Sequence, residues 1–290
     1  MKVFLIIFSL LINVAFAQSK AGFYVVNGKV ITVQDTSSRN YLKAIENAGV
    51  VPSVLQNAAS NFLVTSEKAI GSYSLITAQY PIMGGTAATH IFNLNKPTGL
   101  ATDFTLEFNA TGWTHSATGA KPDGTTFANT KLNLSTSGLT AGNIHLSYFS
   151  GTNETTKVFT LSATNNAGDN QYAIYANFSG NSFSTQGNTS NTDRITVANT
   201  RGDGYFLSNR PSTTLHNFYR NGVLLSTSSA TLSTTVLPNV PMIIGSLNLT
   251  ETSNRELKEA RYISAGAGFT STIEINQSKI VTFFNSMQNR

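Results

Sequence analysis

Cysteine is absent from all 290 residues of this chain. Its absence excludes disulfide bonds, a thiolate metal site, a cysteine nucleophile and a lipid-anchored N-terminal cysteine. An exported protein without disulfides depends on the size of its hydrophobic core. A hydrophobic fraction of 40% is sufficient for such a core.

Charged residues are also scarce, at 11% of the chain against about 25% in an average soluble protein. The polar surface must therefore come from Ser, Thr, Asn and Gln, a composition typical of an extracellular or virion β-protein. The formal net charge is +5, yet no run rich in Lys and Arg occurs. Because nucleic-acid binding requires a basic patch, we expect no nucleic-acid partner.

Long hydrophobic runs are missing apart from one at the N-terminus. Lys2 precedes the mostly apolar residues 3–14, and residues 15–17 (Ala-Phe-Ala) form a small–x–small site. We interpret residues 1–17 as a cleaved signal peptide and expect a secreted, extracellular protein. No other run approaches the roughly 20 residues of a membrane span, so none is expected.

Two Asn-Gly pairs predict β-hairpins. Asn221-Gly222 lies between the β-like runs 215–220 and 223–225. A two-residue type I′ turn needs positive φ at both central positions, which Asn-Gly accepts readily. Asn27-Gly28 gives the same signal, so we expect residues 18–40 to form a short hairpin and linker.

The periodicity of the chain then changes twice. Residues 41–79 carry apolar side chains at helical spacing, which predicts a small helical unit. Residues 80–290 hold short alternating runs, including 104–108, separated by Gly, Asn, Ser and Thr clusters, which predicts an antiparallel β-sandwich. Ser271 to Glu274 fits the capping box of a C-terminal helix, which we expect on an edge of the sandwich.

The Asn221-Gly222 hairpin is followed, about twenty residues later, by residues 242–245 (Met-Ile-Ile-Gly). This arrangement resembles the laminin-G/concanavalin A-like jelly roll. The resemblance implies an all-β, antiparallel jelly-roll sandwich of a kind often used to bind sugars.

A second resemblance covers residues 41–290. Residues 80–90 (Tyr-Pro-Ile-Met-Gly-Gly-Thr-Ala-Ala-Thr-His), 112–119, 146–150 and 266–270 resemble a poorly characterised group found in tailed-phage particles and Bacteroidota secreted proteins. It implies a laminin-G-like sandwich with a role in surface attachment or phage structure, and no catalytic residues. A cleavable signal is unusual for a virion protein, so the source, bacterial or phage, stays open.

The motifs of common enzymes are absent. Glycoside hydrolysis needs two facing carboxylates, and the nearest cluster, Glu251, Glu256 and Glu259, is interpreted as solvated charges. None of the four histidines has metal-ligand spacing or a nucleophile-elbow context. We expect His145 and His216 to face water or cap an edge. The chain is therefore predicted not to be an enzyme.

The sequence predicts no cofactor, and the metal content is unknown. A structural calcium ion stays open, because several carboxylates sit in turn-like contexts that also suit calcium. These are Asp103, Asp123, Asp169, Asp193 and Asp203. His90 and His115 flank glycine-rich turns and are expected to form hydrogen bonds within loops.

Sugar binding combines aromatic rings, which stack on the apolar sugar face, with amides that bind hydroxyls. The candidate ligand-binding residues on this basis are Trp113, His115, Tyr172, Tyr175, Asn177, Tyr205 and Asn209. The alternative is that these aromatics fill the core, which is the interpretation we favour for Trp113.

We therefore predict a secreted, non-catalytic module that binds a glycan or cell-surface polymer in adhesion or recognition. The alternatives are a structural or receptor-binding phage particle protein of a tail or fibre, located in the virion, and a polysaccharide hydrolase. A homo-oligomer stays open.

The signal-peptide interpretation predicts the start of the mature chain. Protein purified from its native host should begin at Gln18, because residues 15–17 form the small–x–small site that follows the apolar run. Intact-mass measurement checks this, and a mass that retains Met1 would contradict it.

Overall fold

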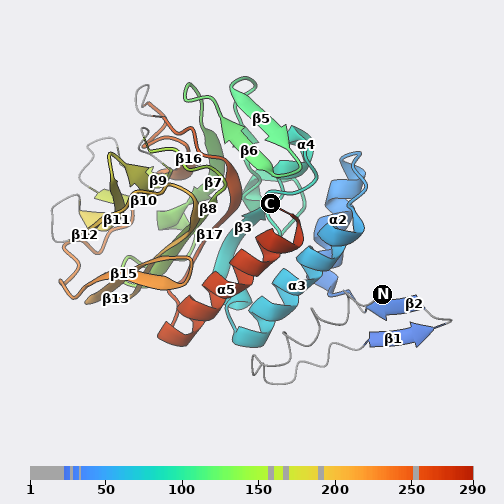
Figure 1. Cartoon of the computed structure of the whole chain (residues 1–290). Coiled ribbons are helices and arrows are strands. Elements are labelled where there is room, and N and C mark those ends of the chain that lie inside the picture. The colour runs from blue at the N-terminus through green and yellow to red at the C-terminus, as the bar shows by residue number, and fades with distance from the viewer. Residues whose placement is uncertain are drawn as a thin grey trace.

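The computed structural model describes residues 34–155, 160–165, 170–188, 193–250 and 255–289, together with the backbone of 23–26 and 29–32. The expected signal peptide and the Asn27-Gly28 turn lie outside these residues. The molecule is a two-sheet β-sandwich with helices packed on one side (Figure 1).

The first sheet of the sandwich has seven strands. Their order is β12 (Arg194–Ala198), β11 (Asn181–Asn188), β10 (Asn170–Phe178), β9 (Leu161–Thr164), β16 (Pro241–Ile244), β7 (Ala128–Asn133) and β4 (Glu107–Phe108). Neighbouring strands pair antiparallel throughout, as the sequence predicts.

The second sheet has eight strands and is also antiparallel. Their order is β15 (Val223–Ser228), β14 (Leu215–Arg220), β13 (Gly204–Ser212), β8 (Ile144–Ser150), β17 (Ala260–Gly266), β6 (Gly119–Pro122) and β5 (Trp113–Ser116). The eighth strand, β3 (Ile76–Pro81), also pairs with β17. A separate hairpin joins β1 (Phe23–Val26) to β2 (Lys29–Thr32).

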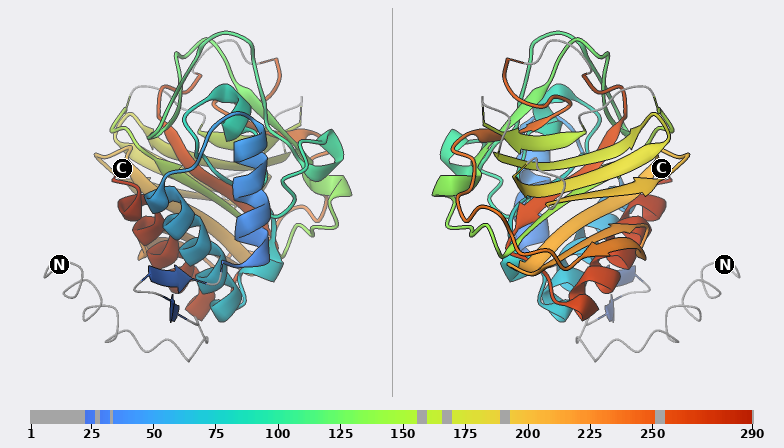
Figure 2. Two further views of the ribbon diagram at one scale, coloured as in Figure 1. Left: turned by 90° about the vertical axis from the view of Figure 1, so that its right-hand side faces the viewer. Right: turned by 90° about the vertical axis from the view of Figure 1, so that its left-hand side faces the viewer.

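Three helices cover the outer face of the eight-stranded sheet, as the two views of Figure 2 show. They are α2 (Thr36–Asn47), α3 (Val54–Ile70) and α5 (Ser271–Met287). Short helical turns occur at α4 (Ala87–His90), Tyr73–Leu75, Ala101–Asp103 and Leu134–Thr136. No helix in the described part of the chain is long and apolar enough to cross a membrane.

The eight-stranded sheet is buried on both faces. Phe206 of β13 packs into the core between the sheets, while its neighbours Tyr205 and Leu207 pack into a second core under the helices. Successive side chains of a strand point to opposite faces, so one strand supplies both cores. This explains why residues 204–210 are all buried instead of alternating with exposed residues.

The N-terminal helical unit begins at sequence-encoded caps. Asp35 caps α2 by accepting the N–H of Ser37, and Ser53 forms a reciprocal capping box with Gln56 at the start of α3. Gly71, in the left-handed conformation, ends α3. The predicted helical unit, C-terminal helix and sandwich are therefore all confirmed.

The Asn221-Gly222 turn has the predicted geometry. Both residues have positive φ, 49° for Asn221 and 78° for Gly222, and Arg220 pairs with Val223 across the turn. The Asn221 side chain also accepts the N–H of Tyr205 at 2.8 Å. The turn is thus tied to the strand beside it as well as closing its own hairpin.

Three expectations about local structure are wrong. The C-terminal helix lies on a sheet face, not on an edge, because its apolar side covers the face of the eight-stranded sheet that carries Tyr205.

The N-cap of this helix is Thr270, so Ser271 to Glu274 is not a capping box. The Glu274 side chain is instead buried between the helix and the sheet. The alternating run 104–108 forms only the two-residue strand β4, because Phe104 is left-handed after a 3₁₀ turn.

A buried polar network joins the helices to the sheet. The carboxyl of Glu67 on α3 lies within hydrogen-bond distance of Gln79 on β3, Tyr262 on β17 and Gln277 on α5, at 3.1, 3.2 and 2.7 Å. Its side chain is fully buried. Burial raises the pKa of Glu67 to about 7, because a charged carboxylate loses its hydration there.

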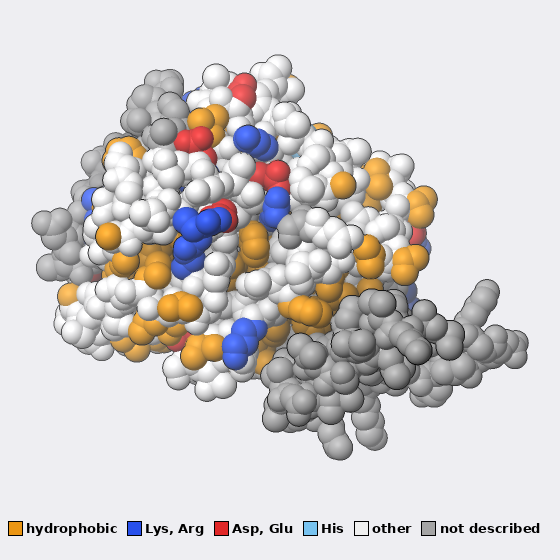
Figure 3. All heavy atoms as spheres, viewed as in Figure 1, with side chains coloured by type: hydrophobic (Ala, Val, Ile, Leu, Met, Phe, Trp, Pro, Cys, Tyr) orange, Lys and Arg blue, Asp and Glu red, His pale blue; other side chains and the backbone are white. Residues whose placement is uncertain are grey.

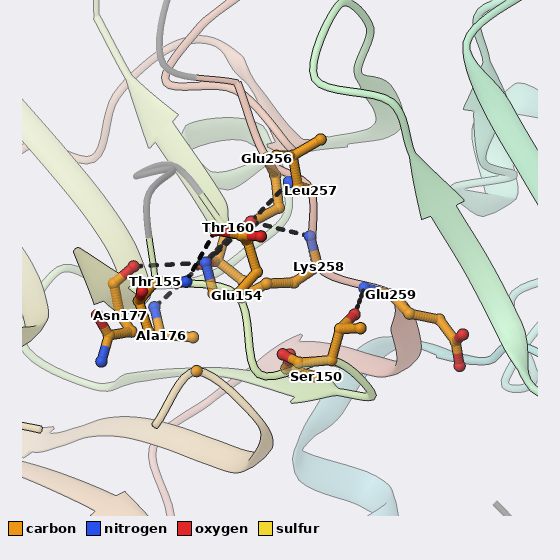
Figure 4. A network of polar contacts seen from close by, with 12 residues as sticks. Ser150, Glu154, Thr155, Thr160, Ala176, Asn177, Glu256, Leu257, Lys258 and Glu259 are labelled. Carbon is orange, nitrogen blue, oxygen red and sulfur yellow. Dashed lines mark hydrogen bonds and ion pairs between the residues drawn. The ribbon is translucent and has the colours of Figure 1, made fainter. Parts of the chain in front are cut away.

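A buried ion pair ties the two sheets together at one end. Lys258 and Glu256, both fully buried, come from the segment before β17, and Lys258 Nζ lies 2.9 Å from Glu256 Oε1. Figure 4 shows Lys258 reaching to the end of β10, where Nζ donates to the carbonyl of Asn177 at 3.4 Å. Glu256 Oε2 also accepts the hydroxyl proton of Thr160 at 2.7 Å.

The raised pKa of Glu67 predicts a pH-dependent stability. Below pH 4.5 the carboxyl is protonated in both states, whereas between about pH 4.5 and 7 only the unfolded chain releases its proton. Stability should therefore fall by about 3 kcal/mol as the pH rises through this interval. Glu67→Gln should lack this loss, so its stability relative to the wild type should improve between pH 5 and 8.

Chemical denaturation of both proteins across this pH range measures the difference. Glu46→Gln on the exposed side of α2 serves as the control and should show no change relative to the wild type. If the difference in free energy of unfolding between Glu67→Gln and the wild type does not vary with pH, Glu67 is ionised in the folded protein.

The Glu256–Lys258 pair predicts a non-additive double substitution. Lys258→Met should cost about 3–5 kcal/mol, because it leaves a buried carboxylate without its partner. Adding Glu256→Gln should recover part of that loss, since no buried charge then remains. Denaturation midpoints check this, with Lys96→Met in a surface pair as a control expected to cost under about 1 kcal/mol. Simple additivity of the two buried substitutions would refute the coupling.

Candidate functional site

A groove of about 440 Å³ lies where α4 meets the last strand of the seven-stranded sheet. We call it the α4–β4 groove. Its walls are mostly apolar and carry few polar side chains. The residues that line it are Ala87, Ala88, Ile91, Gly99, Ala101, Thr105, Leu106, Glu107, Phe108 and Lys131. The volume lies within the range of small-ligand sites, and the groove is shallow and open to solvent.

The segment 80–90, which carries the second resemblance, builds one wall of this groove. Gly84 and Gly85 have φ of 92° and 84°, and a Cβ on Gly84 would lie 2.5 Å from the Thr89 hydroxyl. Only glycine fits that position, since it combines a left-handed backbone with close packing. Thr86 N–H then donates to Thr89 Oγ1 at 3.2 Å, which starts α4.

The opposite wall carries one ion pair in a strained strand. Lys131 has φ of 59°, unusual for a residue with a side chain, at a β-bulge where β7 departs from its register with β16. Its ammonium contacts the carboxylate of Glu107, and the side chains are 34% and 61% exposed. Bulges often redirect a side chain at functional sites, and here Lys131 lines the groove.

A row of aromatic rings continues from the groove along the sandwich edge. Phe108, at the groove, packs edge-on against Trp113 and His115 of β5, with ring centroids 5.0 and 4.7 Å apart. All three are half-buried. Trp113 Nε1–H donates to the carbonyl of Phe127 at 3.3 Å, so the indole is held in place. Trp113 therefore packs partly against the core and is partly exposed.

His90 and His115 form a direct pair behind this row. Their Nδ1 atoms are 2.9 Å apart, and His90 Nε2 accepts the N–H of Gly85 at 3.1 Å. His90 is buried, and burial lowers the pKa of His115. The pair links α4, in the groove wall, to β5, which carries the aromatic row.

The histidine pair does not suit a metal ion. A neutral imidazole that binds a metal through Nδ1 carries its proton on Nε2. On His90 that nitrogen accepts the Gly85 N–H, so it has no proton to offer. Within the described ranges, no group of three or more His, Asp or Glu side chains could hold a metal.

The seven predicted ligand-binding residues are not brought together. Only Trp113 and His115 adjoin the groove. Tyr172 points into the core between the sheets, and Tyr205 lies under the helices. Asn209 is buried between β13 and the start of α5, where it donates to the carbonyl of Phe269 at 2.9 Å.

Tyr175 and Asn177 lie on the outer face of the seven-stranded sheet and are buried as well. Tyr175 accepts the side-chain amide of Gln171 at 2.7 Å, and Asn177 donates to the carbonyl of Asn199 at 2.5 Å. In this conformation Tyr172, Tyr175, Asn177, Tyr205 and Asn209 expose almost no surface to a ligand.

Two histidines and the carboxylate of Glu256 were expected at the surface, and these expectations are wrong. His145 is fully buried, stacks on Phe269 and has its pKa lowered to about 4 by burial. His216 is fully buried beside Ser184 Oγ, at 2.9 Å. Glu256 is fully buried too, where it pairs with the equally buried Lys258.

The carboxylates considered for calcium are engaged with protein donors where the structure describes them. Asp193 accepts hydrogen bonds from Ser233, and Asp123 from Thr125. Asp103 accepts from Thr98, and Asp203 from Arg201. Asp169 and Glu251 lie outside the described residues.

Sequence reasoning did not identify the residues that line the groove. The alternation of residues 104–108 pointed to a strand near Glu107 and Phe108, but not to an open edge. Lys131 sits in an ordinary alternating run, so no sequence signal marks its positive φ. Its place beside Glu107 depends on the pairing of β4 with β7.

No family model and no curated protein matches this chain. Among solved structures, a sialidase of Trypanosoma rangeli in complex with 2,3-difluorosialic acid matches with a TM-score of 0.51 at 11% identity. The match covers 80% of this chain and 38% of the sialidase chain.

Two further solved structures are similar to parts of the chain. Domain 4 of AbnA, a GH43 extracellular arabinanase from Geobacillus stearothermophilus solved with arabinotriose, matches at 13% identity and a TM-score of 0.41, over 70% of this chain and 98% of that one. The CBM40 of the Ruminococcus gnavus IT-sialidase, bound to α2,6 sialyllactose, matches at 12% identity and a TM-score of 0.36, over 47% and 82%. At 11% identity and a TM-score of 0.51, the likeness to the sialidase is one of fold alone.

Proposed function

We propose that the chain is a non-catalytic carbohydrate-binding module and that its glycan lies in the α4–β4 groove. The observation that carries the proposal is the groove itself. It combines apolar walls, the half-buried ring of Phe108 and the exposed Glu107–Lys131 pair in a volume of about 440 Å³. Aromatic and apolar surfaces bind the C–H face of a sugar, while a few polar groups bind its hydroxyls.

The charges of the groove favour an uncharged sugar. Glu107 supplies hydrogen-bond acceptors and Lys131 supplies donors, so together they match the two roles of a hydroxyl group. Their charges cancel, which leaves no net field to attract an acidic ligand. The face shown in Figure 3 carries few Lys, Arg, Asp and Glu side chains, in line with the 11% charged residues.

Binding without turnover is supported by the carboxylates of the groove. Hydrolysis of a glycosidic bond by the usual route needs two carboxyl groups about 5–10 Å apart on either side of the bond. Among the residues that line the groove, Glu107 is the one carboxylate, and it pairs with Lys131. Affinity should then be weak, about −4 to −8 kcal/mol per site, with attachment strengthened by several copies.

Secretion and a role in adhesion or recognition at a surface belong to the same proposal. They are supported by the signal-peptide pattern of residues 1–17 and by a surface of uncharged polar residues. The resemblance to the phage-particle and Bacteroidota group supports attachment to a surface polymer in either setting. A tail or fibre protein of a phage is the alternative that the binding experiment addresses.

The test is retention of the purified protein on a panel of neutral and acidic polysaccharides, followed by titration calorimetry. Phe108→Ala should weaken binding about tenfold or more, equivalent to about 1.4 kcal/mol, because its aromatic ring lines the groove. Phe178→Ala, a half-buried ring outside the groove, is the matched control and should bind as the wild type does.

Three outcomes would contradict the proposal. Equal losses in the Phe108 and Phe178 variants would place the site elsewhere. Sustained release of reducing ends, lost in Glu107→Gln, would show an enzyme. Lack of retention on every polysaccharide and cell surface would favour a structural particle protein.

A further inference from the structure

The hydrogen bonds of the His90–His115 pair fix the protonation of both rings. His90 Nε2 accepts the Gly85 N–H, so neutral His90 carries its proton on Nδ1. That proton points at His115 Nδ1, 2.9 Å away, which must therefore be an acceptor. His115 accordingly carries its proton on Nε2. Both rings are neutral, each with one defined tautomer.

A further proton has no suitable place in this arrangement. It would add to His90 Nε2, which faces the Gly85 N–H, or to His115 Nδ1, which faces the His90 N–H. In the first case the hydrogen bond from Gly85 would be lost, and in the second the link between the two rings, because two N–H groups would point at each other. The complete series of hydrogen bonds from Gly85 through His90 to His115 therefore exists only while both rings are neutral.

The link holds together the parts that form the groove. His90 ends α4, whose residues Ala87 and Ala88 line one wall. His115 packs edge-on against Phe108, which lines the other side, with the ring planes at 90°. Loss of the link would weaken the attachment of α4 to β5 and the packing of His115 against Phe108.

Neighbouring charges do not oppose this behaviour. Asp103, Glu107 and Glu259 on adjoining elements pair with cations, Glu46 is exposed to solvent, and burial lowers the pKa of His115 from its ordinary value of 6.5. The charged residues on the elements packed around the pair are Glu107 on β4, Lys121 on β6, Glu259 and Arg261 at the start of β17, Lys96 and Asp103 after α4, and Arg39, Lys43 and Glu46 on α2. Lys121 and the three residues of α2 are exposed to solvent.

We infer that the His90–His115 pair is a pH switch that keeps the α4–β4 groove assembled near neutral pH and releases its ligand in mild acid. The part of this inference that concerns ligand release rests on the proposed function. The part that concerns loss of the His90–His115 hydrogen bond does not. Because the folded form resists protonation, the assembled groove is favoured above about pH 6.5 and loses that advantage as the pH falls below it.

Trp113 allows the switch to be measured without a ligand. It is the one Trp in the chain, and its ring centroid lies 6.4 Å from that of His115. Its fluorescence in the purified protein, titrated from pH 8 to 4.5, should change in one step below pH 6.5. His115→Gln should abolish the step, because Gln can accept the His90 proton at every pH.

His90→Gln separates the link from simple protonation of His115. A Gln side chain can accept as well as donate, so protonated His115 would keep a partner. The midpoint of the fluorescence step should then rise by about 0.5–1 pH unit. An unchanged midpoint in His90→Gln, or an unchanged step in His115→Gln, would overturn the switch whether or not any glycan binds.

Ligand release is tested with a polysaccharide that the protein retains at pH 7.5. Its Kd should weaken at least fivefold at pH 5 for the wild type and less than twofold for His115→Gln. If the Kd depends equally on pH in both proteins, the inferred ligand release is overturned while the proposed function stays intact. Failure to retain any polysaccharide at pH 7.5 would instead overturn the proposed function, and the fluorescence titration would still decide the switch.

Discussion

Burial of the eight-stranded sheet on both faces is the constraint on which the rest of the structure depends. Every strand in its centre must supply side chains to two cores, and every polar group on either face must find a partner. On the helix side these partners come from far along the chain. Glu67 bonds to Gln277 of α5, and Glu274 of α5 accepts the side-chain proton of Tyr219. The helical layer is thereby attached to the sheet by polar contacts as well as by apolar packing.

The same constraint decides where a ligand-binding surface can lie. Helices cover the outer face of the eight-stranded sheet, and the residues of β10 are almost entirely buried on both sides. One edge of the sandwich is less covered, where β4 is only two residues long and the loop after β3 folds back as α4. A groove forms there because a short edge strand leaves its neighbours partly uncovered.

The glycine-rich segment after β3 shows how a sequence pattern becomes a site. Gly84 and Gly85 allow a tight left-handed turn, and the turn starts α4 beside Thr86. One helical turn later His90 meets the Gly85 N–H and the ring of His115. The glycine pattern thus positions one wall of the groove against the aromatic row. The hydrogen bonds from Gly85 to His90 and from His90 to His115 hold this wall in place, and together they require neutral imidazoles.

The sequence by itself determined the fold class, the paired helices with their caps and the Asn221-Gly222 turn. These features are local, because helical periodicity, capping side chains and positive-φ pairs act within a few residues. Only the tertiary structure decided which aromatics are accessible. Tyr172 and Tyr205 stand on strands just as Trp113 does, but burial depends on which layer covers each face. Lys131 meets Glu107 because of a bulge and a strand pairing that no local pattern encodes.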